Sequence, residues 1–179
     1  MPRTADEHLE KRILDAGYKL WSKGGEAALT MRAVAKAAGT TTPTLYERFR
    51  DKKDLIKVLQ TRARQRMFRA AQPSRSCSEV CRLILDFALT HGQEYDLLTH
   101  DWAVQLGRKE PMPAFELMKK LLAAELGGTP SKHTKLCLAL VGLIHGTAIL
   151  LFTDEISSEL HAKLRHACLM ACEALIQPA

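Results

Sequence analysis

The sequence predicts an all-α fold of about nine helices. Apolar residues recur at helical spacing along most of the 179-residue chain, and no stretch alternates with period two for long enough to form a strand. Glycine, proline and capping residues divide this pattern into segments of helix length. The apolar fraction of 46% is ordinary for a globular protein. We therefore expect helices packed against helices.

The first predicted helix covers residues 6–23. Its apolar side chains form one stripe: Leu9, Ile13, Leu20 and Trp21. Gly24 and Gly25 end it, because glycine readily adopts the left-handed backbone found at helix ends. Further on, Asp51 caps a fourth helix that runs to about residue 71. Its inward residues are Ile56, Leu59, Ala63 and Met67, and its other side carries Lys53, Lys57, Arg62, Arg64, Arg66 and Arg69.

The segment 72–75 interrupts the helical pattern and marks a domain boundary. Ser76 and Glu79 form a capping-box signature for a fifth helix. Later helices are expected at about 95–106, 113–126, 131–152 and 157–176. We predict a three-helix domain at 1–50, a connecting helix at 51–71 and a C-terminal helical domain at 74–179.

The most informative stretch is residues 30–55, where two short helical patterns lie on either side of a glycine. Thr30 is a suitable N-cap for the first helix, and Gly39 is suited to end it. The apolar residues of this helix are Met31, Val34, Ala35 and Ala38. Pro43 suits the first turn of the next helix, with Thr41 or Thr42 as its cap.

The second of these short helices has an apolar and a polar face. Leu45 and Phe49 point inward at i and i+4. The opposite face presents Thr42, Thr44, Glu47 and Arg48, with Tyr46 at its edge. A helix, a tight turn and a short helix with a polar outer face make up a helix-turn-helix DNA-binding motif.

The motif resembles the tetracycline-repressor (TetR) family of bacterial transcriptional regulators. The matching positions are Thr30, Val34-Ala35, Ala38-Gly39, Thr44-Leu45-Tyr46, Phe49 and Lys52. Thr40, Pro43 and Arg48 depart from the usual pattern, and the last two lie on the DNA side, where they bear on the operator sequence. The resemblance implies an N-terminal DNA-binding domain and a C-terminal domain for ligand binding and dimerisation.

The resemblance also implies which residues contact double-stranded DNA. These are Arg32, Thr42, Pro43, Thr44, Tyr46, Arg48 and Lys52. Arginine binds guanine O6 and N7 in a bidentate manner, and threonine or proline packs on a thymine methyl group. Tyr46 and Lys52 are expected to hold phosphates. An alternative for Tyr46 is packing against the helices, and Glu47 either accepts from cytosine N4 or pairs with Arg50.

The charge distribution agrees with DNA binding. Residues 1–72 hold 16 Lys and Arg against 8 Asp and Glu, a net charge of +8, whereas residues 73–179 hold 10 against 12, a net charge of −2. A basic N-terminal module is what phosphate binding requires. Solvated basic helix faces are the alternative.

The last two helices, 131–152 and 157–176, are expected to form a homodimer interface. The apolar run 136–152 needs cover on more than one side, and the final helix is rich in small residues that permit close approach. Two such helices form half of a four-helix bundle that a second copy completes. The run 136–152 is short for a membrane span and has polar residues at its centre, so we expect a buried helix, no membrane and a cytoplasmic protein.

A small-molecule effector site is expected in the C-terminal half, because TetR-like proteins usually bind a ligand there. The candidate residues are Phe87, His91, Tyr95, His100, Trp102, Phe115, Met118 and His145. Aromatic and methionine residues at helical spacing are also ordinary core residues, and that alternative stays open.

Three pairs of residues at i, i+4 spacing lie on one helix face each and could serve as paired metal ligands or as a thiol sensor. They are Cys77 with Cys81, Cys168 with Cys172, and His133 with Cys137. Buried cysteines also behave as small apolar residues, and five cysteines without an export signal indicate reduced thiols. We expect no metal site and no cofactor.

The function that these patterns favour is a homodimeric repressor that an effector releases from a palindromic operator. The alternative is a DNA-binding regulator without small-molecule control, responding to a partner, to redox state or to a metal. The sequence shows no Gly-x-Ser-x-Gly, P-loop or dinucleotide fingerprint and no catalytic residue set, so we do not expect an enzyme.

Overall fold

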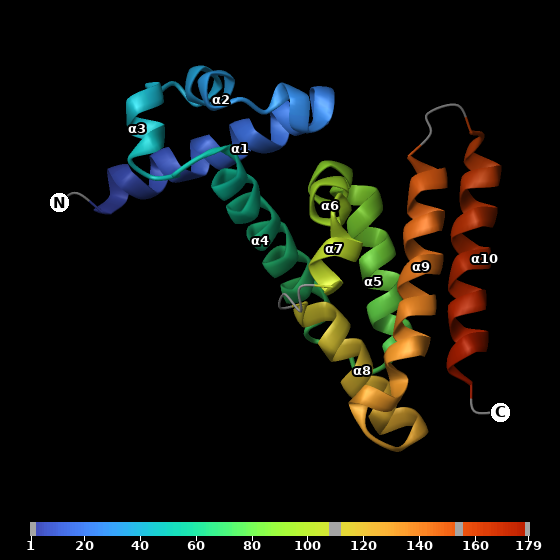
Figure 1. The fold of residues 1–179 in the computed structure, drawn as a ribbon. Coiled ribbons are helices and arrows are strands. Elements are labelled where there is room, and N and C mark those ends of the chain that lie inside the picture. Colours follow the sequence, from blue (N-terminus) through green and yellow to red (C-terminus); the bar gives the residue numbers. More distant parts are fainter. Residues whose placement is uncertain (1–2, 108–111, 153–155, 178–179) are drawn as a thin grey trace. The chain divides into compact units, whose positions relative to one another are not determined.

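The computed structural model describes residues 3–107, 112–152 and 156–177. Within these residues it contains ten α-helices, one short 3-10 helix and no strand, which confirms the all-α prediction (Figure 1). The chain forms two compact units. Unit 1 comprises Met1–Ala63 and Gln93–Val104, and unit 2 comprises Arg64–Gly92 and Gln105–Ala179.

Unit 1 contains the three N-terminal helices and parts of three others. The complete helices are α1 (Arg3–Ala28), α2 (Met31–Ala37) and α3 (Thr42–Tyr46), and the shared ones are α4 (Lys52–Ala71), α6 (Gly92–Thr99) and α7 (Trp102–Gly107). In Figure 1, α2 and α3 lie along the same side of α1. One apolar core joins these elements: Ile13, Leu14, Ala16, Trp21, Leu29, Met31, Val34, Ala35, Ala38, Leu45, Phe49, Leu55, Leu59 and Leu97.

Helices α1 and α4 approach each other closely at Gly17. A Cβ atom at this position would lie 2.9 Å from Cδ1 of Leu59, a side chain with no exposed surface. The hydroxyl of Tyr18 donates a hydrogen bond to the carbonyl oxygen of Leu59 at 3.0 Å. The absence of a side chain at Gly17 therefore lets α4 pack directly on α1.

The predicted end of the first helix is a kink. Helix α1 continues to Ala28, but Gly24 and Gly25 have non-helical backbone angles, and Gly25 has φ of 58°. The glycine pair redirects the chain, as expected from glycine's freedom to adopt positive φ, and a further short piece of helix follows it.

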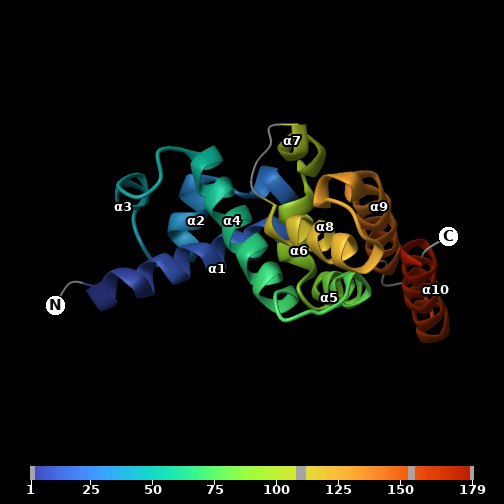
Figure 2. The ribbon, with the colours of Figure 1, turned by 90° about the horizontal axis from the view of Figure 1, so that it is seen from below.

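Unit 2 is built around α9. Its elements are α5 (Cys77–Thr90), α8 (Pro113–Leu126), a 3-10 turn (Pro130–His133), α9 (Thr134–Leu151) and α10 (Ser158–Ile176). Helix α9 contacts α5, α8 and α10, and Figure 2 shows α10 beside α9 on the side away from α8. The side chains of Ser76 and Ser157 cap α5 and α10 by accepting the backbone N–H three residues ahead.

The expected burial of the apolar run 136–152 is found only in part. Leu140 and Ile144 have no exposed surface, whereas Ile149 and Leu150 are 53% and 56% exposed. Pro130–Leu151 is the one helical stretch in the described part of the chain that is long and apolar enough to cross a membrane, and one third of its apolar window is buried. The exposed apolar side chains leave one face of α9 uncovered in the single chain.

The segment predicted as one helix at 95–106 forms two. Helix α6 ends at Thr99, and α7 begins at Trp102. The hydroxyl of Thr99 bonds back to the carbonyl oxygen of Tyr95 at 2.8 Å, and Asp101 accepts a hydrogen bond from the buried Gln60 of α4 at 2.9 Å. These polar contacts hold the break between the two helices in place, and periodicity alone does not reveal them.

Candidate nucleic-acid interface

The helix-turn-helix has the local geometry that its sequence predicts. The Thr30 hydroxyl accepts from the N–H of Ala33 at 3.2 Å, and Thr41 caps α3 by accepting from the N–H of Thr44 at 3.3 Å. Gly39 has φ of 66°. A residue with a Cβ atom is strained at this angle, so glycine fixes the sharp turn between the two helices.

The inner face of α3 is anchored in the core of unit 1. Leu45 has no exposed surface and Phe49 is 5% exposed. Arg12 of α1 also secures the turn, because its Nε donates to the carbonyl oxygen of Ala38 at 3.1 Å. The short helix therefore has a fixed orientation, although five residues are too few for an isolated helix to be stable.

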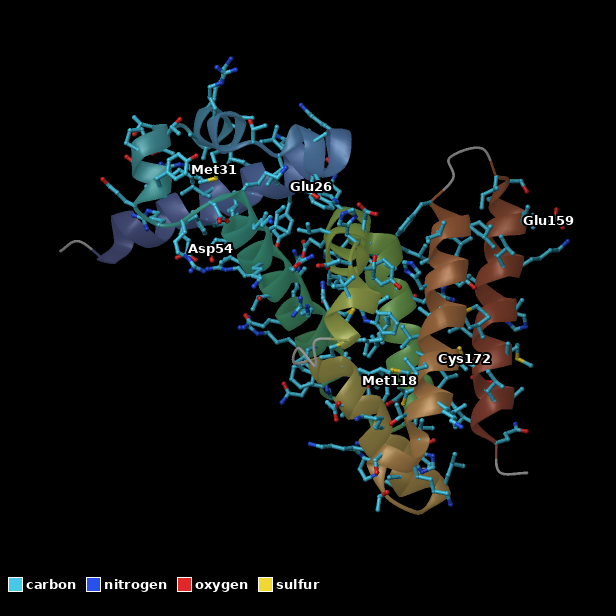
Figure 3. All side chains as sticks on the ribbon, in the orientation of Figure 1. Glu26, Met31, Asp54, Met118, Glu159 and Cys172 are labelled. Atoms are coloured by element: carbon cyan, nitrogen blue, oxygen red, sulfur yellow. The ribbon has the colours of Figure 1, made fainter. Side chains whose placement is uncertain are left out.

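The outer face of the motif is open to solvent. Arg32, Pro43, Tyr46 and Arg48 are exposed, and Tyr46 retains 52% of its surface, so it is not packed in the core. Thr42 and Thr44 are half-buried, and the Thr44 hydroxyl lies 2.9 Å from that of Thr41. Figure 3 shows side chains projecting outward from the α2 and α3 ribbons.

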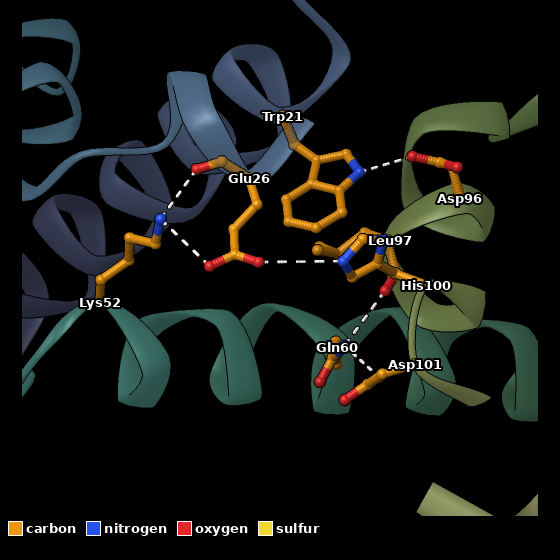
Figure 4. Close-up of polar contacts among 8 residues, drawn as sticks. All are labelled: Trp21, Glu26, Lys52, Gln60, Asp96, Leu97, His100 and Asp101. Atoms are coloured by element: carbon orange, nitrogen blue, oxygen red, sulfur yellow. Dashed lines mark hydrogen bonds and ion pairs between the residues drawn. The ribbon is translucent and has the colours of Figure 1, made fainter. Parts of the chain in front are cut away.

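Lys52, the last of the predicted DNA contacts, is held by Glu26 at the end of α1. The Lys52 ammonium donates to the carbonyl oxygen of Glu26 at 2.9 Å and lies 3.2 Å from its carboxylate (Figure 4). The Lys52 side chain is 34% exposed. Sequence reasoning did not find this contact, because nothing in the local pattern relates residues 26 positions apart.

The first turn of α4 contains a second local charge pair. Asp51 caps the helix by accepting from the N–H of Asp54 at 2.8 Å, as predicted. Arg50 pairs with Asp54, not with Glu47 as one alternative proposed, and Glu47 is exposed. The Arg50 backbone N–H, 3.1 Å from Asp54, lowers the pKa of Asp54 below its usual value, and the Arg50 guanidinium adds to this effect.

The basic side of α4 is mostly exposed, as expected. Lys53, Lys57, Arg62, Arg66 and Arg69 are exposed, whereas Arg64 is only partly so. Arg62 forms an ion pair with Glu10 of α1 at 2.5 Å. Five of these six basic side chains are therefore exposed, although Arg62 and Arg66 also contact Glu10 and His91.

Residues Gln93–Val104 pack within unit 1, although they follow unit 2 residues in the sequence. The indole N–H of Trp21 donates to a carboxylate oxygen of Asp96 at 2.6 Å, and the ring of Trp21 meets that of His100 edge-on with centroids 5.0 Å apart. His100 Nε2 lies 3.9 Å from the Glu26 carboxylate (Figure 4). The Glu26 side chain thus lies between Lys52 and His100.

Comparison with known proteins agrees with this geometry. Residues 13–59 match the model of the family described as bacterial regulatory proteins, tetR family. The chain is 32% identical over 145 residues to the HTH-type transcriptional repressor KstR of Rhodococcus jostii strain RHA1, covering 76% of this chain and 68% of that protein. The chain belongs to the tetR family.

Solved structures of TetR-like proteins share the fold. A transcriptional regulator of Aquifex aeolicus VF5 matches with a TM-score of 0.71 and 16% identity over 93% of this chain and 99% of that one. A TetR-like transcriptional regulator from Rhodococcus sp. RHA1 matches with a TM-score of 0.67 and 23% identity over 93% and 96% of the two chains. TetR-family proteins are transcriptional regulators and generally not enzymes, so this helix-turn-helix protein is a DNA-binding regulator.

The predicted effector residues of this TetR-family chain divide between the two units. Tyr95, His100 and Trp102 belong to unit 1, and the remaining five belong to unit 2: Phe87, His91, Phe115, Met118 and His145. Tyr95 is 2% exposed, while His100 retains about half of its side-chain surface. The effector site stays a prediction.

Several of the candidate effector residues in unit 2 are buried, stacked on another ring or hydrogen-bonded. Phe87 and His91 stack with ring centroids 4.8 Å apart. Both nitrogens of His91 are engaged, Nε2 by Arg66 at 2.8 Å and Nδ1 by Thr90 at 2.7 Å. Because arginine only donates, Nε2 accepts and the proton lies on Nδ1. Further candidates are buried: Phe115 is 8% exposed and Met118 has no exposed surface.

All five cysteines are buried and free. No group of three or more metal-ligating side chains occurs among the described residues. In the third proposed pair, Nε2 of His133 is already 2.8 Å from the carbonyl oxygen of Gly127, so this histidine closes the turn before α9.

Proposed function

We propose that this TetR-family protein is a homodimeric repressor that binds a palindromic operator and is released from it by a small-molecule effector. The observation that supports the DNA-binding part most strongly is the capped, core-anchored helix α3 with an open outer face. The similarity to the KstR repressor supports repression as the sign of regulation.

Helix α3 enters the major groove in this proposal. Arg32 and Arg48 are exposed and reach guanine edges, while Pro43 and the methyl groups of Thr42 and Thr44 pack on thymine. Tyr46 and Lys52 hold phosphates and set the register of the protein on the duplex. Two copies of α3 then occupy successive major grooves about one helical turn apart.

Selection of binding sites from a random pool of duplex DNA tests this proposal without knowledge of the operator. We expect recovered sequences with two inverted half-sites whose centres are separated by about 10 base pairs or a multiple of this spacing. Recovery of sequences without inverted symmetry would contradict a two-fold dimer on DNA. No enrichment above non-specific binding would contradict sequence-specific binding.

The dimer is proposed to form through α9 and α10. Exposed residues on α9 follow one stripe at helical spacing: Leu138, Ala139, Gly142, Gly146, Ile149 and Leu150. The Cβ positions at Gly142 and Gly146 face open space, which allows another helix to approach closely. Helix α10 adds Leu160, Met170 and Leu175, each at least 44% exposed. Covering these side chains removes apolar surface from water.

The variant Gly146→Leu tests this interface. Within a single chain, no atom lies within 4 Å of a Cβ placed at position 146. Leucine also has a higher helix propensity than glycine, so the variant should keep the fold. In the dimer the same side chain blocks the approach of the second copy. We expect wild type to sediment near twice 20.0 kDa and the variant to be monomeric, with Lys120→Leu on α8 as the dimeric control. A dimeric Gly146→Leu protein would contradict the interface.

The effector is proposed to bind among the helices of the C-terminal domain, residues 74–179. The DNA-binding domain is residues 1–50, and the helix at 51–71 connects the two domains. The aromatic side chains of Phe87, His91 and Phe115 support an apolar ligand site with few polar groups. A compound that raises the melting temperature and weakens operator binding would support this proposal. As a DNA-bound regulator, the protein is expected in the cytoplasm.

A further inference from the structure

The Glu26 carboxylate near the end of α1 is shared between two basic side chains of unit 1. Its Oε1 lies 3.2 Å from the Lys52 ammonium at the start of α4, and its Oε2 lies 3.9 Å from Nε2 of His100, between α6 and α7 (Figure 4). The backbone carbonyl of Glu26 also accepts from Lys52 at 2.9 Å. We call Lys52, Glu26 and His100 the charge triad.

The contacts with Glu26 use much of the hydrogen-bonding capacity of Lys52. A lysine ammonium has three N–H donors and no acceptor. The carbonyl and carboxylate oxygens of Glu26 both lie within reach of these donors. The carboxylate charge also offsets the positive charge that attracts a phosphate. In this arrangement, the Glu26 carboxylate competes with any phosphate for Lys52.

His100 is held beside this carboxylate by contacts of its ring and of the residues before and after it. The Trp21 ring meets the imidazole edge-on at a centroid distance of 5.0 Å. Gln60 of α4 is 3% exposed, and its side-chain amide donates to the carbonyl oxygen of Leu97 at 3.2 Å and to the Asp101 carboxylate at 2.9 Å. The imidazole therefore has a defined position, although about half of its side-chain surface is exposed.

Charged side chains from three elements surround His100. Helix α1 contributes Glu26, and α4 contributes Lys52 on the other side of that carboxylate. The α6–α7 segment contributes Asp96 and Asp101, which already accept hydrogen bonds from the indole of α1 and the buried amide of α4. Nε2 of His100 is at ion-pair distance from Glu26. Glu26 is therefore the carboxylate with which a protonated His100 pairs.

Protonation of His100 changes the balance within the charge triad. Histidine is the side chain whose charge changes most readily between about pH 5 and 8. At 3.9 Å the neutral imidazole is too far away for a hydrogen bond, so the Glu26 carboxylate interacts mainly with Lys52. A protonated imidazole attracts the same carboxylate, and the triad gains one positive charge. Less of the Glu26 charge is then available to offset that of Lys52.

We propose that Glu26 and His100 are positioning residues for the phosphate contact of Lys52, and that protonation of His100 strengthens DNA binding by drawing the Glu26 carboxylate away from Lys52. This rests on the proposed function, in which Lys52 holds a phosphate. The affinity for DNA then rises as the pH falls through the range in which histidine titrates. Each chain contributes roughly a 1.5-fold to 5-fold change, the range expected for one exposed ion pair.

Titration of random duplex DNA with the full-length protein at about pH 8 and about pH 6, at one ionic strength, tests the proposal. We expect the wild type to bind more tightly at the lower pH. His100→Gln, which stays neutral, should lose most of this difference. His100→Lys, which stays positively charged, should bind tightly at both pH values.

The variant Glu26→Gln distinguishes action through the carboxylate from direct attraction of DNA by the imidazolium charge. If His100 acts through Glu26, this variant binds tightly at both pH values. If the charge of His100 attracts DNA directly, Glu26→Gln keeps the full wild-type difference, and the proposal is wrong. Glu26 is exposed, so its replacement should leave the fold intact and decide the question even if the His100 variants fold poorly.

His8 provides a matched control, because it is an exposed histidine on α1 that lies outside the charge triad. His8→Gln should keep the wild-type difference between the two pH values. A difference that disappears in His8→Gln and persists in His100→Gln would assign the effect to another histidine and overturn the proposal. Equal wild-type affinity at both pH values would overturn this proposal alone, whereas absence of DNA binding at either pH would overturn the proposed function as well.

Discussion

Removing the Asp96 carboxylate should destabilise unit 1, because it leaves the indole N–H of Trp21 without its acceptor. The two atoms are 2.6 Å apart, and Trp21 is 2% exposed, so water does not readily replace the lost partner. A hydrogen bond to a charged group contributes about 1.5–3 kcal/mol. Asp96 itself is exposed, which places the expected loss for Asp96→Ala at the lower end, about 1.5 kcal/mol.

A double-mutant cycle isolates this contact. Urea unfolding followed by circular dichroism gives the free energies of unfolding of wild type, Asp96→Ala, Trp21→Phe and the double variant. Because Trp21→Phe also removes indole volume, only the coupling term measures the hydrogen bond, and we expect about 1 kcal/mol or more. Gln93→Ala, an exposed change on the same helix, should stay within about 0.5 kcal/mol of wild type. Additive single effects would refute the contact.

Three further changes probe other parts of the account. Gly17→Val should cost about 1–3 kcal/mol of stability by overpacking against Leu59, and an unchanged urea midpoint would contradict the close approach of α1 and α4. Glu26→Gln removes the carboxylate charge beside Lys52 and should strengthen binding to random DNA, while the backbone carbonyl of residue 26 still accepts from Lys52. Lys52→Ala should weaken this binding and flatten its salt dependence by about one unit of slope. Equal binding by both variants would be evidence against a phosphate contact. Burial raises the pKa of the Cys137 thiol from its ordinary value of 9.0 to about 12, so its contribution to stability is full below pH 9.0 and is lost as the pH rises through 12. The stability should fall by at most about 1.4 kcal/mol per pH unit over this range, and this fall should be absent in Cys137→Ala.

The sequence was sufficient for the features that local chemistry determines. The Thr30 cap, the left-handed Gly39 and the inward Leu45 depend on residues within four positions of one another, and each is found as predicted. Ser76 caps α5 as expected, but Glu79 accepts from the N–H of Arg75 and not from that of Ser76, so only half of the capping box forms.

Long-range contacts were beyond sequence reasoning. Trp21 and Asp96 are 75 positions apart, and no periodicity connects them. The grouping of Gln93–Val104 with unit 1 depends on such contacts and separates His100 from the unit 2 residues proposed to share its ligand site. The cysteine pairs were visible at i, i+4 spacing, but the contact between α5 and α10, which hold two of these pairs, was not.

The central claim is that the outer face of α3 recognises the operator. Its most direct test is a titration of the selected operator and of random DNA with wild type, Arg48→Ala and Thr44→Ala. The cap of α3 survives both changes, because Thr41 accepts from the backbone N–H of residue 44. We expect each variant to lose about 1–3 kcal/mol of operator-binding free energy, which is roughly a 5-fold to 150-fold loss of affinity. Affinity for random DNA and the stability of the fold should be nearly unchanged. The control Lys120→Ala should bind like wild type. Wild-type operator affinity in both variants would contradict the claim.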